Sequence, residues 1–181
     1  MPIEVTTYYL EITDRTQLRP KQVTGRSDLA LIEAEIPLPE LNRFLYTAVG
    51  GDWFWTARIG WSYAAWQQWL AQPGLRTWVL YVAGTPAGYF ELLAHTVTDI
   101  EIEHFGLIPR FVGEGLGGYL LTQAIETAWA IGGQRVWLHT CTQDHPNALN
   151  NYRARGMRVF KEETGNYELP EKTPGPWPGA R

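Results

Sequence analysis

A glycine-rich segment in the second half of the chain constrains the fold most. It places four glycines within the six residues Gly113-Glu114-Gly115-Leu116-Gly117-Gly118. An alternating apolar segment precedes it, and apolar residues at helical spacing follow it. Glycine lets the backbone curl closely around a ligand, and the free N–H groups at a helix start attract anions. The sequence therefore predicts a strand, a phosphate-binding loop and a helix in direct succession.

The spacing of the glycines differs from that of two other phosphate-binding loops. A mononucleotide loop needs Gly-Lys followed by Ser or Thr, and the chain has no such triplet. The dinucleotide pattern needs three differently spaced glycines early in a βαβ unit. The remaining alternative is a turn that only lets strand and helix pack closely.

Composition narrows the class of protein. A chain of 181 residues with 45% hydrophobic residues predicts a single domain with a sizeable core. A net charge of −4 argues against a nucleic-acid partner, and no apolar run is long enough for a membrane partner. The N-terminus does not resemble a secretory signal, and Cys141 is the single cysteine. We therefore expect a cytoplasmic protein.

The hydrophobic periodicity predicts an α+β order of elements. Expected strands cover residues 5–12, 29–36, 77–82, 87–94, 99–107, 135–140 and 157–162. Expected helices cover residues 41–50, 62–72 and 116–131, with a short one that starts at Asp144 and Pro146 and ends at Gly156.

Two segments resemble motifs of the GNAT superfamily of acyl-CoA-dependent N-acyltransferases. Val112-Gly113-Glu114-Gly115-Leu116-Gly117 is similar to the family's loop pattern of Gln or Arg, two residues, Gly, one residue, and Gly or Ala. Val112 departs from that pattern. Ala148-Leu149-Asn150-Asn151-Tyr152-Arg153-Ala154-Arg155-Gly156-Met157 resembles the family's helix motif A-x-x-L-Y-x-x-x-G-F. The resemblance covers roughly residues 76–163.

The resemblance implies a fold and a division of the chain. We expect a GNAT fold, an α/β sandwich in which helices flank a mixed, largely antiparallel twisted sheet of about six to seven strands. Residues 1–170 would form a single domain, with strands and aromatic acceptor-side helices in 1–75 and the acyl-CoA-binding core in 76–163. Residues 171–181, rich in proline and glycine, would form a loose tail.

The resemblance also implies acetyl-CoA as co-substrate. The pyrophosphate would bind the backbone N–H groups of the glycine loop, and the pantetheine arm would lie along an exposed strand edge. The residues expected to contact the coenzyme are Phe105, Leu107, Ile108, Val112, Gly113, Glu114, Gly115, Leu116, Gly117, Gly118, His145 and Asn147.

Acyl transfer to an amine needs a proton donor for the departing thiolate and a base for the amine. By motif position, Tyr152 is the expected donor; the alternative is a ring that only packs on the sheet. Glu103 is the expected base, with Glu91 a weaker candidate, whereas Glu101 is expected to be an exposed strand residue. Strict alternation places Glu101, Glu103, Phe105 and Leu107 on one face and Ile102, His104 and Gly106 on the other.

The acceptor side is aromatic. Trp53 and Trp55, in an expected loop, are the predicted substrate contacts, because aromatic faces bind flat or cationic groups. The four histidines and Cys141 show no metal-ligand spacing, so no metal is expected, and Cys141 is interpreted as an inert core thiol. Exposed aromatic residues and an unpaired final strand are compatible with a homodimer.

The predicted function is N-acetylation of a primary amine of a small molecule or peptide, by direct attack within a ternary complex with acetyl-CoA. An alternative is an acyl-CoA-binding sensor or regulatory module without turnover. A third interpretation, a structural protein with a coincidental glycine loop, predicts no CoA binding.

Overall fold

The computed structural model describes residues 2–177. Met1 and residues 178–181, the last four of the predicted tail, lie outside this range. The strands of the described part are β1 (Ile3–Ile12), β2 (Leu29–Glu33), β3 (Leu75–Val82), β4 (Thr85–Ala94), β5 (Asp99–Leu107), β6 (Arg135–Cys141) and β7 (Arg158–Tyr167). Its α-helices are α1 (Pro39–Gly50), α2 (Tyr63–Leu70), α3 (Leu116–Ala130) and α4 (Ala148–Ala154).

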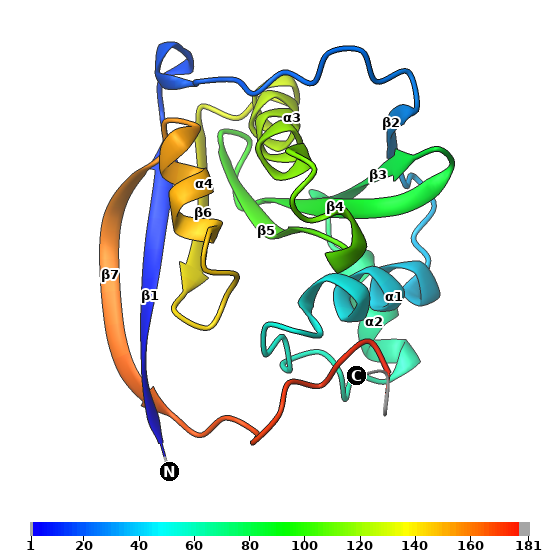
Figure 1. The fold of residues 1–181 in the computed structure, drawn as a ribbon, viewed down its shortest axis with the longest axis vertical. Helices are drawn as coiled ribbons and strands as arrows, with labels where there is room; N and C mark the ends of the chain where they lie inside the picture. The colour runs from blue at the N-terminus through cyan, green and yellow to red at the C-terminus, as the bar shows by residue number, and fades with distance from the viewer. Residues whose placement is uncertain (1, 178–181) are drawn as a thin grey trace.

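The strands form one open sheet in the order β2-β3-β4-β5-β6-β1-β7 (Figure 1). Every neighbouring pair is antiparallel except β5 and β6, which are parallel and joined through α3. A parallel pair needs such a crossover, because the chain must return to the edge at which the first strand began. The expected α+β class and mixed, mostly antiparallel GNAT-like sheet are confirmed.

The sheet forks between β5 and β6. These strands pair only from Asp99 opposite Arg135 to Glu101 opposite Trp137, and then separate (Figure 1). Backbone groups at the free ends of both strands therefore face a gap that other atoms must fill. This fork determines where the cavity described below can form.

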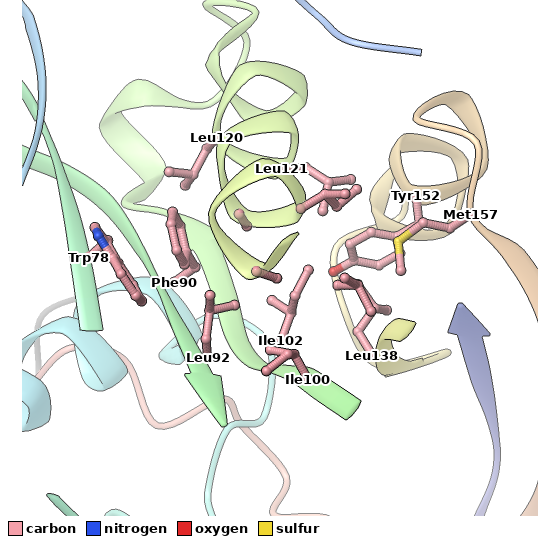
Figure 2. Close-up of a cluster of buried hydrophobic side chains, with 14 of the residues drawn as sticks. Trp78, Phe90, Leu92, Ile100, Ile102, Leu120, Leu121, Leu138, Tyr152 and Met157 are labelled. Atoms are coloured by element: carbon pink, nitrogen blue, oxygen red, sulfur yellow. The ribbon is translucent and has the colours of Figure 1, made fainter. Parts of the chain in front are cut away.

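Helices cover both faces of the sheet. The main hydrophobic core lies beneath α3 and α4, where Leu120 and Leu121 pack toward Ile100, Ile102 and residues of the neighbouring strands (Figure 2). The helix α3 buries Leu116, Leu120, Leu121, Ala124, Ile125 and Ala128, at the spacing that predicted it. On the other face, α1 packs Leu45 and Val49 against Val79 and Tyr89.

A β-bulge changes the predicted faces of β5. Glu91 pairs with His104 and Leu92 with Ile102, so Glu103 is the extra residue. Such an insertion breaks strict alternation. As a result Glu103 and His104 both face the α1 side, while Phe105 joins Ile102 in the core beneath α3. The predicted grouping of Glu103 with Phe105 is therefore wrong.

One other local prediction, the start of the last helix, is wrong. The last helix begins at Ala148 rather than at Asp144, because the Asp144 carboxylate accepts hydrogen bonds from Thr140 and from the Cys141 N–H instead of capping a helix. Residues 171–177 of the predicted loose tail form no helix or strand, yet the Gly175 N–H donates to the Gly51 carbonyl at 2.9 Å.

Candidate active site

A cavity of about 760 Å³ occupies the fork of the sheet. Its walls come from both diverging strands, the glycine loop, α4 and the loop between α1 and α2. This volume lies within the range that holds a small-molecule ligand. Because the strands separate here, the cavity connects the α3–α4 face of the sheet with the α1–α2 face.

The glycine loop supplies one end of the cavity. Gly113 and Gly115 have φ angles of 92° and 78°, a left-handed conformation that favours glycine. No N–H group from Gly113 to Gly118 has a hydrogen-bond partner within the described residues, and no side chain caps the start of α3. A row of free amides at the positive end of a 15-residue helix is suited to bind an anion.

Two cationic side chains, Lys21 and Arg155, line the cavity beside this loop. A Cβ atom at Gly118 would collide with the Arg155 guanidinium and lie 3.2 Å from Lys21. The Lys21 N–H donates to Thr122 at 3.0 Å, which fixes the segment before β2 against α3. Neither side chain has a carboxylate partner among residues 2–177, and the Arg155 Nε is buried without a hydrogen bond.

Tyr152 reaches the fork from the α4 side. It is 7% exposed, its ring lies 5.9 Å from that of Phe105, and it lines the cavity. Figure 2 shows its hydroxyl pointing toward Leu138 of β6. Burial, together with the charge of Asp144, raises the pKa of Tyr152 well above its usual value, so the hydroxyl stays protonated.

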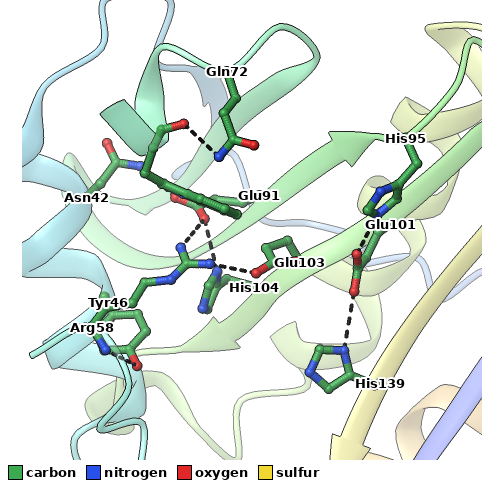
Figure 3. Close-up of polar contacts among 11 residues, drawn as sticks. Asn42, Tyr46, Arg58, Gln72, Glu91, His95, Glu101, Glu103, His104 and His139 are labelled. Atoms are coloured by element: carbon green, nitrogen blue, oxygen red, sulfur yellow. Dashed lines mark hydrogen bonds and ion pairs between the residues drawn. The ribbon is translucent and has the colours of Figure 1, made fainter. Parts of the chain in front are cut away.

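On the α1 side, Arg58 holds two carboxylates (Figure 3). Its Nη2 donates to Glu103 at 2.6 Å, its Nη1 lies 3.7 Å from Glu91, and its guanidinium lies 3.7 Å from the Trp69 ring centroid. His104 Nδ1 lies 3.0 Å from the same Glu91 oxygen, Oε2. We call these four charged or titratable residues, Arg58, Glu91, Glu103 and His104, the Arg58 network.

The two carboxylates of the Arg58 network differ in their proton affinity. Burial alone would raise the pKa of Glu91, but hydrogen bonds from His104 and Asn42 and the charge of Arg58 bring it below the usual range. Burial raises the pKa of Glu103, and the charges of His104 and Arg58 only partly oppose this effect. Glu103 lines the cavity, whereas Glu91 does not.

A third carboxylate, Glu101, lies between two histidines at the fork (Figure 3). Its oxygens are 2.7 Å from His95 Nε2 and 3.2 Å from His139 Nδ1. At 4% exposure Glu101 is buried, so its predicted place as an exposed strand residue is wrong. The bond to Glu101 raises the pKa of His139, and burial only partly opposes it.

The loop between α1 and α2 carries the predicted aromatic contacts. The Trp53 ring lies 4.9 Å from that of His145, and the Trp55 Nε1–H donates to Asp144 at 3.2 Å. Trp66, by contrast, is 2% exposed and belongs to the core. The loop after α1 is thereby fastened across the cavity to the loop after β6.

Most of the predicted site residues meet in this one cavity. Those that line it are Trp53, Trp55, Glu103, Phe105, Leu107, Val112, Gly113, Gly115, Gly117, Gly118, His145, Asn147 and Tyr152. Ile108, Glu114 and Leu116 do not line it: Ile108 packs near α1, Glu114 pairs with Arg110, and Leu116 is fully buried. The backbone of these three residues lies beside the loop, and the coenzyme contacts expected of them remain predictions.

Sequence reasoning missed several residues of the cavity. Lys21 lies far from the motifs in sequence, and Arg155 lies inside one of them but was not singled out. His104 and His139 carried no recognisable local signal, because only the pairing of β4, β5 and β6 brings their partners together.

Within the described residues, no group of three or more His, Cys, Asp or Glu side chains could hold a metal ion. The helices of residues 2–177 also include none with the length and apolar character needed to cross a membrane.

Several solved structures with a similar fold carry the name of acetyltransferases. The chain superposes on a GCN5-related N-acetyltransferase from Kribbella flavida with a TM-score of 0.64 and 16% identity, over 91% of this chain and 58% of that one. For a GCN5-related N-acetyltransferase from Sphaerobacter thermophilus the TM-score is 0.62 and the identity 18%, over 94% and 53%. The chain thus spans just over half the length of these two proteins.

An aminoglycoside acetyltransferase from a soil metagenomic sample is also similar, with a TM-score of 0.56 and 17% identity over 71% of this chain and 87% of that one. At such identities the likeness shows the fold alone. The family is shown by sequence: the model of the acetyltransferase (GNAT) family matches residues 42–157. The chain therefore belongs to the GNAT acetyltransferase family. No curated protein sequence matches it.

Proposed function

We propose that this protein transfers an acetyl group from acetyl-CoA to a primary amine of a small molecule or peptide. The observation that carries the proposal is the set of unpartnered N–H groups at Gly113–Gly118, flanked by Lys21 and Arg155, at one end of a cavity in the forked sheet. A pyrophosphate offers acceptor oxygens and negative charge to both sets of donors. Val112, which departs from the family pattern, needs no side-chain contact in this arrangement.

The distribution of charge supports an amine as acceptor. The loop end of the cavity is cationic, whereas the carboxylates Glu103 and Asp144 line the region near the fork. Negative charge in a partly enclosed cleft raises the local concentration of cations, and most primary amines are cationic in water. Trp53 and Trp55 add aromatic faces that attract cations.

The reaction follows from the contents of the fork. The ammonium loses one proton to a base, and the amine nitrogen then attacks the thioester carbonyl carbon, forming a C–N bond. When the C–S bond breaks, the sulfur takes a proton from Tyr152, and the second proton of the amine nitrogen restores the phenol. Acetyl-CoA and an ammonium thus give an acetamide, CoA thiol and one released proton.

The proposed acid and the predicted base lie on opposite faces of the sheet. Tyr152 enters from the α4 side, and Glu103 enters from the α1 side. A thioester held in the gap between β5 and β6 would therefore meet the acid on one side and the amine on the other. Attack by the amine on one side and departure of the CoA thiolate on the other suit a direct transfer without a covalent enzyme intermediate.

Turnover tests the proposal directly. The purified protein is incubated with acetyl-CoA and a panel of primary amines that includes phenethylamine, tryptamine, spermidine and a lysine peptide, and products are identified by mass. We expect an acetylated amine and one equivalent of CoA thiol. A thermal shift with acetyl-CoA but no product across the panel would favour the sensor, and no shift would contradict donor binding.

Tyr152→Phe tests the acid. We expect kcat to fall by about 100-fold, because a positioned general acid contributes on this scale, with little change in the acetyl-CoA dissociation constant. Since burial raises the pKa of Tyr152, wild-type kcat should show no alkaline decline from this group across the neutral range. Unchanged kcat in the variant would limit Tyr152 to packing.

A further inference from the structure

We propose that His139 is the base that takes the proton from the acceptor ammonium, and that Glu101 is the residue that positions its ring. The inference rests on the proposed amine acetylation and identifies the proton acceptor of that same site. His139 lines the cavity, and its side chain is 48% exposed, whereas Glu101 beneath it is 5% exposed.

The contact with Glu101 determines which nitrogen is free. An ionised carboxylate only accepts hydrogen bonds, so the Nδ1 of His139 must carry the proton shared with Glu101. Burial favours the neutral form of Glu101, but hydrogen bonds from His139 and His95 outweigh it and lower its pKa, so it is ionised. The neutral His139 ring therefore keeps its lone pair on Nε2, the nitrogen away from Glu101 in Figure 3.

The position of His139 at the fork suits this role. The last parallel pair is Glu101 with Trp137, so His139 is the first residue of β6 beyond the pairing whose side chain lies on the same face as Trp137. Main-chain atoms of both strands diverge from here, and this is where the cavity begins. Across the gap, Tyr152 enters from the opposite face.

Glu103, the base predicted from the sequence, has a competing partner. One of its oxygens accepts a hydrogen bond from Arg58 at 2.6 Å, and Arg58 is itself 7% exposed. Although burial raises the pKa of Glu103, the Arg58 guanidinium occupies this oxygen and holds the carboxylate on the α1 side of the cavity. Glu103 therefore attracts the acceptor ammonium, and His139 accepts the proton that the ammonium loses.

The charged and titratable groups around His139 define its pH dependence. Glu101 and Glu103 act on it from β5, Asp144 acts from the loop after β6, and Tyr9 of β1 lies 5.9 Å away ring to ring. Glu101 is the largest cause of the raised pKa. Only the neutral ring accepts a proton, so activity should rise with pH through a value above that of an ordinary histidine.

The proton step balances without any further reactant. The ammonium N–H bond breaks, the proton bonds to His139 Nε2, and the nitrogen keeps the electron pair with which it attacks the thioester. His139 then releases the proton to water through the exposed part of its ring.

His139→Gln is the central variant. With phenethylamine, or the best substrate of the amine panel, we expect kcat/KM at pH 7 to fall by about 100-fold or more, with acetyl-CoA affinity unchanged. The loss should shrink to less than about tenfold near pH 10, where the free amine needs no base. With an arylamine such as aniline, already neutral at pH 7, wild type and variant should differ by less than about threefold.

Glu101→Gln separates positioning from packing. Removing the charge that raises the His139 pKa should move the acid limb of kcat/KM to lower pH, and the Hε1 proton resonance of His139 should titrate at correspondingly lower pH. If Glu101 had a purely structural role, the substitution would lower activity at all pH values. Neither the acid limb of kcat/KM nor the titration of the His139 resonance would then move. The NMR titration needs no acceptor, so it is informative even if no amine is acetylated.

His95→Gln is the matched control. His95 bonds the same carboxylate but does not line the cavity, and the glutamine amide can still donate to Glu101. We expect kcat/KM of His95→Gln to stay within about threefold of wild type at both pH 7 and pH 10. Its wild-type-like behaviour would show that losing a histidine beside Glu101 is not itself damaging.

Three results overturn the inference, and they are distinguishable. Full activity of His139→Gln, or a loss that is equal at pH 7 and pH 10, removes His139 as the base while leaving the proposed function intact. The same pH-dependent loss in Glu103→Gln, with His139→Gln unaffected, returns the role to Glu103. Failure of wild type to acetylate any amine contradicts the proposed function, and the inference with it.

Discussion

At the residue scale, two cations of the cavity, Lys21 and Arg155, have no carboxylate partner among residues 2–177. Arg26, Arg76, Arg135 and Arg158 all contact carboxylates on the surface. Arg155 instead directs its guanidinium toward the free amides of the glycine loop. A cation kept without a carboxylate partner is the arrangement expected where an anionic ligand supplies the missing charge.

Arg155→Gln should raise the acetyl-CoA dissociation constant by about tenfold, the effect of losing one charge-assisted hydrogen bond of about 1.5 kcal/mol. Isothermal titration at two salt concentrations measures it, and the variant should also show a weaker salt dependence. Arg153→Gln, an exposed neighbour outside the cavity, is the control. An equal loss with acetyl-pantetheine, which lacks the pyrophosphate, would contradict a phosphate contact.

At the element scale, the sequence predicted local features well and long-range ones poorly. The Ser62 hydroxyl accepts from the Ala65 N–H and starts α2 as expected, and β5 has the predicted bounds. These signals are local, since caps and periodicity act within one or two turns. The bulge at Glu103 was missed because it depends on the register with β4, which the residues of β5 do not encode alone.

The Arg58 network stabilises the contact between the α1–α2 loop and the sheet. Arg58→Met should lower the free energy of unfolding by about 3–5 kcal/mol, because it leaves the buried Glu91 without its cation. Chemical denaturation measures the change. Arg76→Met, which breaks an ion pair with Glu33 that is more exposed, should cost about 1 kcal/mol or less. Equal effects of both variants would mean that the buried network adds no stability.

At the scale of the whole molecule, the sheet consists of two parts that meet at the fork. The strands β2, β3, β4 and β5 follow chain order, whereas β1 lies between β6 and β7, far from β2 in the sheet. The sequence does not predict this place for β1, because no local pattern specifies a partner about 130 residues away, and such pairings depend on the completed fold. Lys21 reaches the glycine loop for the same reason, since the chain must cross from β1 over α3 to reach β2.

Deletion of residues 2–13 should abolish cooperative unfolding, because β6 and β7 would lose their shared partner and the core would lose Leu10 and Ile12. Circular dichroism during thermal unfolding tests this expectation. Deletion of residues 171–181 removes one described backbone hydrogen bond to Gly51, so it should change the free energy of unfolding by about 1 kcal/mol or less. A cooperative transition in the first variant would contradict a central role for β1.

The location of the donor phosphates is the central claim, and backbone NMR tests it most directly. In ¹H–¹⁵N spectra of the labelled protein titrated with CoA, the N–H groups of Gly113–Gly118 and the side-chain Nε–H of Arg155 should show the largest shifts. Pantetheine, which lacks the phosphates, should leave these resonances nearly unmoved while still shifting the N–H resonances of Phe105 and Leu107. Shifts by CoA that are confined to other parts of the chain would contradict the account.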